Sequence, residues 1–143
     1  MIIFRDIILI GILFVICYTD IKRMEIDNEP ILIGLAFIIP LSIAGLNSVT
    51  TYSSVYGFFL GGIVFAILTI WGMGGGDVKL MAMIGFFLGW QQLIGIIILS
   101  FIIGAALGVC YVFLFKKSFK SYIPFGPPIA IATVLTIFFG GVV

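Results

Sequence analysis

A nearly continuous apolar stretch between residues 80 and 115 places the strongest limit on how this chain can fold, and its only adjacent polar pair is Gln91–Gln92. A single helix of that length, at about 1.5 Å per residue, would overshoot the roughly 30 Å hydrocarbon core of a bilayer. We therefore place a turn at Gly89–Gln92. Of the 143 residues, 63% are hydrophobic and only 9% are charged, whereas a soluble domain has about 25% charged residues. The composition indicates a membrane protein.

Six apolar segments divide the chain and are joined by short turns. They are apolar on every face and longer than the alternating strands of about ten residues in membrane β-barrels. The predicted fold is therefore all-α: a polytopic membrane protein of about six transmembrane helices in a single bundle, with one domain over residues 1–143. The first segment is expected to be retained, because no small-x-small cleavage site follows it. The segments cover residues 2–19, 31–46, 55–71, 77–90 and 93–115, and the sixth follows Pro128 to the C-terminus.

Residue types that are missing or rare exclude several classes of site. The sequence has no histidine, and its two cysteines form no C-x-x-C pair, which excludes the usual structural zinc sites and any catalysis that needs imidazole. The glycines before Asp77 are not followed by the G-K-[S/T] of a phosphate-binding loop. A net charge of +1 gives no reason to expect a nucleic acid as partner. No metal and no cofactor are predicted.

The positions of lysine and arginine predict an orientation, because cytoplasmic loops carry an excess of these residues. Basic residues follow the first segment, lie near the start of the fourth and follow the fifth, while Arg5 is the one exception. Six spans with both termini outside would place these three turns in the cytoplasm. Asp20, Asp77 and the stretch Pro124–Pro127 would then lie at the same side of the membrane. The basic residues concerned are Lys22, Arg23, Lys79, Lys116, Lys117 and Lys120.

Asp77 is the carboxylate that most needs an explanation, because it lies inside an apolar region directly after Gly74–Gly76. A charge at membrane depth costs about 2.5–3.5 kcal/mol on insertion scales, so it is a functional candidate by default. If Asp20 lies close to it, the two carboxylates cannot both ionise, and one can act as base while the other acts as acid in hydrolysis. The glycines can leave helical geometry and let a substrate backbone approach.

Plainer interpretations of these charges stay open. Asp20 can be an ordinary helix-end carboxylate, and Asp77 can cap the fourth segment, with Lys79 as its neutralising partner or extended toward the surface. The acidic residues at 25, 27 and 29 can form a solvated turn or attract a basic peptide. Intramembrane carboxylates also serve proton-coupled transporters. A third alternative is an assembly subunit of a secretion system, in which both aspartates could be replaced without effect.

Three motifs resemble those of the type IV prepilin peptidases, which are intramembrane aspartic proteases with a G-x-G-D motif. Gly74–Leu80 resembles the family's G-x-G-D-x-K-L in full, and Pro124–Pro127 resembles its late Pro-Phe-Gly-Pro. Six residues after Asp20, Ile26-Asp27-Asn28 stands where the family has Ile-Pro-Asn. G-x-G-D alone would be less specific, since presenilin-like and signal-peptide-peptidase-like enzymes share it. Here the three motifs occur in the family's order across essentially the whole chain.

The resemblance implies that Asp20 and Asp77 are the catalytic pair. It implies cleavage of the leader peptide from type IV pilin or pseudopilin precursors, just before their hydrophobic helix, at the cytoplasmic face of a prokaryotic inner membrane. The N-terminal domain with a four-cysteine zinc site, which larger members carry and which accompanies N-methylation, has no counterpart here, so a cleavage-only form is expected. Partners would be prepilin-like proteins and lipid, and the oligomeric state is open, a homo-oligomer included. The residues expected to bind substrate or support the site are Gly74, Gly76, Lys79, Pro124, Phe125, Gly126 and Pro127.

Overall fold

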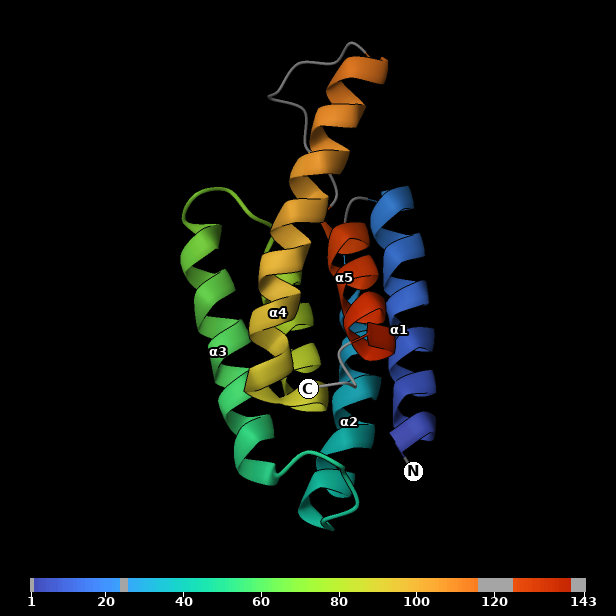
Figure 1. Ribbon diagram of the computed structural model, residues 1–143, viewed down its shortest axis with the longest axis vertical. Coiled ribbons are helices and arrows are strands. Elements are labelled where there is room, and N and C mark those ends of the chain that lie inside the picture. The colour runs from blue at the N-terminus through green and yellow to red at the C-terminus, as the bar shows by residue number, and fades with distance from the viewer. Residues whose placement is uncertain (1, 24–25, 116–124, 140–143) are drawn as a thin grey trace.

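The described part of the protein is a bundle of helices without strands. The structure is a computed structural model, and it describes residues 2–23, 26–115 and 125–139, leaving out the side chains of residues 2–3 and 111–115. The helices lie side by side along the long axis of the molecule (Figure 1). The predicted all-α class is confirmed for these residues. The helices are α1 (Ile2–Arg23), α2 (Asn28–Ile43), α3 (Thr51–Thr69), α4 (Gly75–Phe115) and α5 (Gly126–Phe139).

The prediction of about six spans is not supported. Two described helices are long and apolar enough to cross a bilayer, at Thr51–Thr69 and Gly75–Cys110, whereas Asn28–Ile43 and Gly126–Phe139 are shorter apolar helices. The fourth and fifth predicted segments form the two halves of α4, which are separated by the non-helical residue Gly89. The turn predicted at Gly89–Gln92 is therefore confirmed, and it begins at Gly89. The two halves of α4 run in opposite directions (Figure 1).

Gly89 allows this reversal because its backbone adopts φ 82° and ψ 166°. A positive φ is costly for residues with a side chain, because the Cβ atom crowds the backbone. The surroundings leave no room for a side chain either: a Cβ atom at Gly89 would lie 2.6 Å from the Ser53 Oγ and 2.8 Å from the Val49 Cγ1. The turn between the two halves of α4 is therefore possible only with glycine at this position.

Glycines also bring α3 and the first half of α4 into direct contact. A Cβ atom on either Gly57 or Gly85 would overlap the backbone carbonyl of the other, and one at Gly61 would lie 2.5 Å from the Met81 carbonyl oxygen. Gly62 makes an ordinary contact, at 3.7 Å, with the Ala82 Cβ. Small residues at such spacing let helices approach closely in lipid. This close approach sets the position of the helix that carries Asp77.

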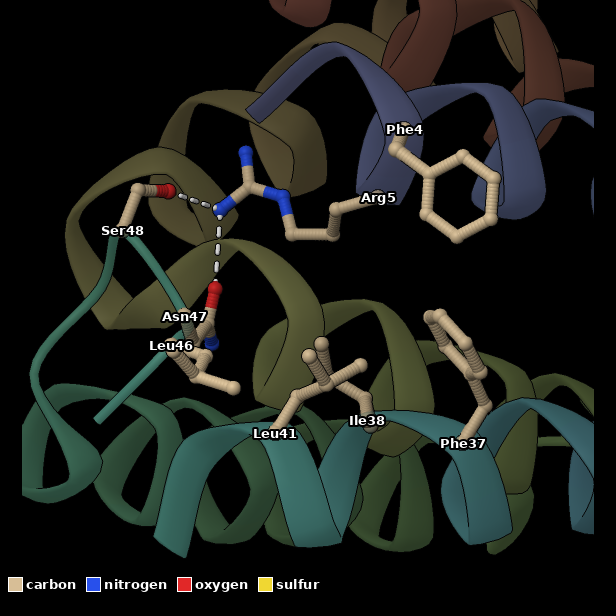
Figure 2. Close-up of a pocket in the computed structure, with 8 residues that line it drawn as sticks. All are labelled: Phe4, Arg5, Phe37, Ile38, Leu41, Leu46, Asn47 and Ser48. Carbon is tan, nitrogen blue, oxygen red and sulfur yellow. Dashed lines mark hydrogen bonds between the residues drawn. The ribbon is translucent and has the colours of Figure 1, made fainter. Parts of the chain in front are cut away.

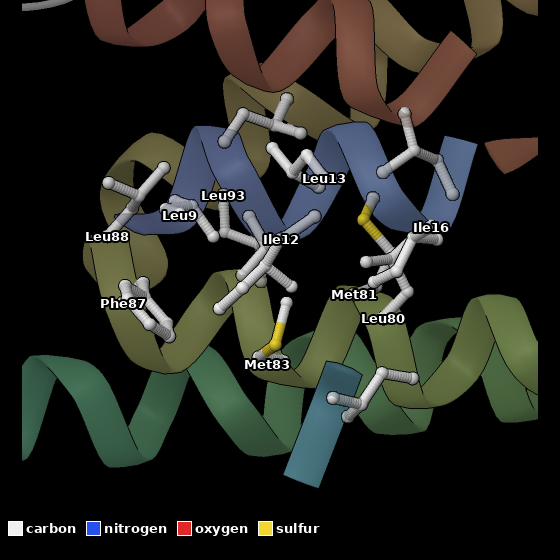
Figure 3. Close-up of a cluster of buried hydrophobic side chains, with 14 of the residues drawn as sticks. Leu9, Ile12, Leu13, Ile16, Leu80, Met81, Met83, Phe87, Leu88 and Leu93 are labelled. Atoms are coloured by element: carbon white, nitrogen blue, oxygen red, sulfur yellow. The ribbon is translucent and has the colours of Figure 1, made fainter. Parts of the chain in front are cut away.

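The core lies along the middle of the bundle and is formed by apolar side chains from all the described helices. On α1 these residues recur at helical spacing, so that one face of the helix is buried. Many large apolar side chains point outward instead, among them Phe14, Ile43, Trp71 and Phe139. An outer surface this apolar fits lipid better than water. Figure 3 shows a part of the buried cluster, which includes Leu9, Leu13, Ile16, Ile38, Phe65, Leu80, Met81, Met83, Phe87 and Ile129.

A buried arginine holds the lower end of the bundle together (Figure 2). Arg5 is 9% exposed, and its Nε donates a hydrogen bond to the Asp6 Oδ1 at 2.8 Å. Its Nη1 donates to the Ser48 Oγ at 2.6 Å and the Asn47 Oδ1 at 3.2 Å, in the connection between α2 and α3, and to the Phe87 carbonyl at 3.4 Å. Arg5, the exception to the predicted distribution of basic residues, is therefore paired with polar groups inside the protein.

Candidate active site

The two aspartates singled out by the sequence lie at the same end of the bundle. α1 rises to this end, which is the upper one in Figure 1, and the first half of α4 descends from it. Ile16 of α1 belongs to the same buried cluster as Met81 of α4 (Figure 3). Asp20 is one turn beyond Ile16 and Asp77 is one turn before Met81, so both carboxylates continue the packed faces of their helices. They are close enough for the charge of Asp20 to act on Asp77.

Both carboxylates are withdrawn from the surface. Asp20 is 3% exposed and Asp77 is 4% exposed. Carboxylates are almost never fully buried without a partner. One partner of Asp20 is the backbone N–H of Gly126, which donates a hydrogen bond to the Asp20 Oδ2 at 2.9 Å. Helix α1 and the start of α5 therefore meet at this carboxylate.

Asp77 lies inside the first turn of α4 and is not its N-cap, because the helix begins at Gly75. Its backbone N–H donates to the Gly74 carbonyl at 3.1 Å. A negative charge in the first turn of a helix is favoured by the helix dipole. The capping interpretation therefore does not account for the position of Asp77, although the dipole does contribute to its environment.

The glycines before Asp77 differ in what surrounds them. Gly74 precedes α4, whereas Gly75 and Gly76 are already helical, so the expectation that all three leave helical geometry is wrong for the last two. A Cβ atom at Gly76 would lie 2.7 Å from the Cβ of Ile26, while one at Gly75 would meet nothing within 4 Å. Gly76 thus lets the connection between α1 and α2 close over the start of α4.

Lys79 is exposed and is directed to α2: its Nζ donates to the Asn28 Oδ1 at 2.8 Å. This contact joins the motif Ile26–Asn28 to the motif Gly74–Leu80, and it gives Lys79 a partner other than Asp77. Lys79, Asn28 and Val78 also line an apolar groove between α2, α3 and α4. The groove thus begins directly after Asp77 along α4.

Asp27 stands where the family that the sequence resembles has proline, and its backbone has φ −63° and ψ 140°. Proline is locked near φ −65°, so the backbone here has the shape that proline would impose. Asp27 lies at the N-cap of α2 without a side-chain capping hydrogen bond, and its Oδ2 is 3.9 Å from the Arg23 Nη1. Glu29 is exposed in the first turn of α2, and Glu25 lies outside the described residues.

The late motif lies at the start of α5, and Pro124 falls outside the described residues. Phe125 packs near two aromatic rings, with centroid distances of 5.5 Å to Phe101 and 6.4 Å to Phe65. Pro127 is in the first turn of α5, where its missing N–H costs no helical hydrogen bond. Nothing in the sequence distinguishes Phe65 and Phe101 from the other apolar residues of their helices, so their contact with Phe125 is visible only in the structure.

No group of three or more acidic, cysteine or histidine side chains that could hold a metal ion is found within residues 2–23, 26–115 and 125–139. Two buried carboxylates on separate helices, with one of them accepting a backbone hydrogen bond, can exchange protons with a water molecule or a peptide between them.

Comparison with known proteins adds independent information. Residues 7–109 match the type IV leader peptidase family. A protein of Bacillus subtilis named prepilin leader peptidase/N-methyltransferase is 32% identical over 96% of this chain and 56% of its own length. Proteins of the same name from Aeromonas salmonicida and Pseudomonas aeruginosa are 31% and 32% identical, over 93% and 91% of this chain and 48% and 50% of their own lengths. The chain therefore spans about half the length of the curated relatives it matches. No solved structure matches it.

Proposed function

The chain belongs to the type IV leader peptidase family, and on that premise we propose that it is an intramembrane aspartic endopeptidase with Asp20 and Asp77 as its catalytic pair. The observation that carries the proposal is the burial of these two carboxylates, on α1 and α4, at the same end of the bundle. Buried carboxylates gathered at one place are typical of functional sites. The proposed substrates are the precursors of type IV pilins and pseudopilins.

The pair can hydrolyse a peptide bond with no other group. Because two neighbouring carboxylates do not both ionise readily, one holds a proton. The ionised carboxylate takes a proton from water as the water oxygen attacks the carbonyl carbon, and the neutral carboxyl gives its proton to the carbonyl oxygen. As the C–N bond breaks, the first carboxyl protonates the leaving nitrogen and the second recovers its proton from the hydroxyl oxygen. Both groups return to their starting states.

We place the site at the cytoplasmic face of the inner membrane, in a multi-pass protein. The outer surface of the bundle is rich in exposed apolar side chains, which supports a lipid environment. Lys22, Arg23 and Lys79 lie at the same end as Asp20 and Asp77, and such residues favour the cytoplasmic side. Cleavage would then occur where the polar leader of a substrate meets the apolar part that stays in the bilayer.

The test is co-expression with a prepilin-like substrate, followed by separation of precursor and product on a gel. Asp20→Asn and Asp77→Asn keep the size of each side chain and remove its acid–base function, so each variant should lose cleavage by at least about a thousandfold, as removal of one member of a catalytic unit commonly does. Asp27→Asn is the matched control, because this carboxylate lies in the same region but is 41% exposed. Cleavage at the wild-type rate by either buried variant would refute the assignment.

A proton-coupled transporter gains little support from the described residues. The charged residues of α1 cluster near its two ends, and the buried positions between Arg5 and Asp20 are Leu9, Ile12, Leu13 and Ile16. A proton path through the bundle would need polar groups there. Ser100 and Thr133 are buried, but each donates its hydroxyl hydrogen bond to the carbonyl four residues earlier in its own helix.

A further inference from the structure

The start of α5 is fixed in place by an aromatic contact. The ring of Phe125 lies against α4 at Gly104, where a Cβ atom would be 2.5 Å from the Phe125 Cε2. The ring is also near Phe101 of α4 and Phe65 of α3. The absence of a side chain at Gly104 therefore makes the notch that the ring fills. A ring held on several sides in this way has little freedom to move.

The next residue touches Asp20 itself. The Gly126 N–H donates to the Asp20 Oδ2 at 2.9 Å, in a buried contact. A Cβ atom at Gly126 would lie 2.5 Å from the same oxygen and 3.1 Å from the Asp20 Cγ. Any residue other than glycine would displace the carboxylate or the helix. Gly126 thus combines a directed donor with the space that lets the carboxylate approach it.

The two contacts are linked through the backbone. The Phe125 carbonyl accepts a hydrogen bond from the Ile129 N–H at 3.3 Å, so Phe125 occupies the position that opens α5. The Gly126 N–H is one of the first donors of the helix, which have no partner within the helix and favour a negative charge. Fixing the Phe125 ring therefore fixes the direction in which this N–H points.

We infer that Phe125 and Gly126 are positioning residues that hold the carboxylate of Asp20 in its working orientation, and that Gly104 supports them by accommodating the Phe125 ring. This inference rests on the proposed function, in which Asp20 is catalytic. Of the two roles expected for Phe125 and Gly126, it assigns them the support of the site and not contact with substrate. A misplacement of about 1 Å at a catalytic group can cost about a hundredfold in rate.

The kinetic test uses three glycine variants of the full chain. Gly126→Ala inserts a methyl group against Asp20, and Gly104→Ala inserts one against Phe125, away from the carboxylate. Gly95→Ala is the matched control, because a Cβ atom there meets nothing within 4 Å. We expect kcat for prepilin cleavage to fall at least tenfold in the first two variants, with KM within twofold of the wild type, and neither constant to change in the third. A raised KM with unchanged kcat would show substrate contact and overturn the inference, as would full activity of Gly126→Ala.

A second measurement does not depend on activity and remains available if Gly126→Ala fails to fold. The protein is labelled with ¹⁵N-glycine in detergent micelles, and the amide proton of Gly126 is compared in the wild type, Asp20→Ala and Asp27→Ala. A hydrogen bond to a carboxylate moves an amide proton downfield, so its loss in Asp20→Ala should shift the signal upfield, with no such shift in Asp27→Ala. An unchanged signal in Asp20→Ala would overturn the inference. A shift in a protein that cleaves no prepilin would support the contact and reject the proposed function instead.

Discussion

Gly76 packs directly against Ile26, so that a Cβ atom on the glycine would lie 2.7 Å from the Cβ of the isoleucine. This contact places the connection that follows α1 directly against the first turn of α4, at the residue before Asp77. The glycine that the motif requires is thus explained by the packing of the chain on itself. Its neighbour Gly75 has open space at the same position.

The two adjacent glycines should therefore respond very differently to the same substitution. Gly76→Ala should shift the first turn of α4 away from Ile26 and lower cleavage at least tenfold, because Asp77 moves with that turn. Gly75→Ala should keep nearly wild-type cleavage and gain slightly in helix propensity. Both are measured by the rate of leader removal at equal protein levels. Equal activities of the two variants would contradict the packing explanation.

The contact between α3 and α4 gives a prediction about stability. Gly57→Ala and Gly85→Ala each force a methyl group into the backbone of the other helix, and overpacking of this kind costs about 1–3 kcal/mol. Gly62→Ala should cost far less, because its Cβ atom would make an ordinary 3.7 Å contact with Ala82. The measurement is thermal unfolding in detergent followed by circular dichroism. If Gly62→Ala proved as destabilising as the other two, the proposed helix register would be wrong.

Arg5 should matter for stability and not for catalysis. Arg5→Gln removes the charge that pairs with Asp6 and weakens the hydrogen bonds to Asn47 and Ser48. Removing one partner from a buried polar network costs about 1–3 kcal/mol or more, so the unfolding temperature should fall. The KM of the folded fraction should not change, because the network lies at the end opposite Asp20. Lys22→Gln, at an exposed position, serves as the control and should unfold at the wild-type temperature.

Asp27→Pro tests whether the departure from the family pattern has a structural cost. The backbone φ of −63° at this position already suits proline. A proline that fits the native backbone stabilises a protein by about 0.4–1 kcal/mol, because it lowers the conformational entropy of the unfolded chain. The lost ion pair with Arg23 is at the surface and contributes little. We expect unchanged cleavage and an equal or slightly higher unfolding temperature. A marked loss of stability would show that the Asp27 N–H or side chain has a role that the φ value does not reveal.

Glu29 gives a test of substrate recruitment. It is exposed in the first turn of α2, which follows the helix that carries Asp20, and a basic leader peptide would be attracted to it. Glu29→Gln should raise KM for a prepilin with a basic leader, and the difference from the wild type should shrink as salt is added, because exposed charges are screened. The kcat should not change. An unaltered KM at low salt would leave Glu29 as part of a solvated turn.

Several features of this protein could be predicted from the sequence because they depend on composition and on patterns along the chain. The length and polarity of the apolar segments predicted an all-helical membrane protein. The distribution of basic residues predicted that Asp20 and Asp77 lie at one end, and the end of α1 and the start of α4 do lie together at one end of the bundle. The reversal of the chain at Gly89 was also predicted, because a single helix over residues 80–115 would be too long for a bilayer. The prediction of six spans was not supported, because only two of the described helices are long and apolar enough to cross a bilayer.

Only the tertiary structure decided which distant residues contact Asp20 and the motif that contains Asp77. The contact between Asp20 and Gly126 joins positions 106 residues apart, and the pairing of Lys79 with Asn28 joins positions 51 residues apart. The glycines at 76, 104 and 126 look alike in sequence, but each accommodates a different neighbour. The pattern of apolar residues along the chain indicates which positions are withdrawn from water. It does not indicate which distant residue each of them contacts, because that depends on how the helices pack.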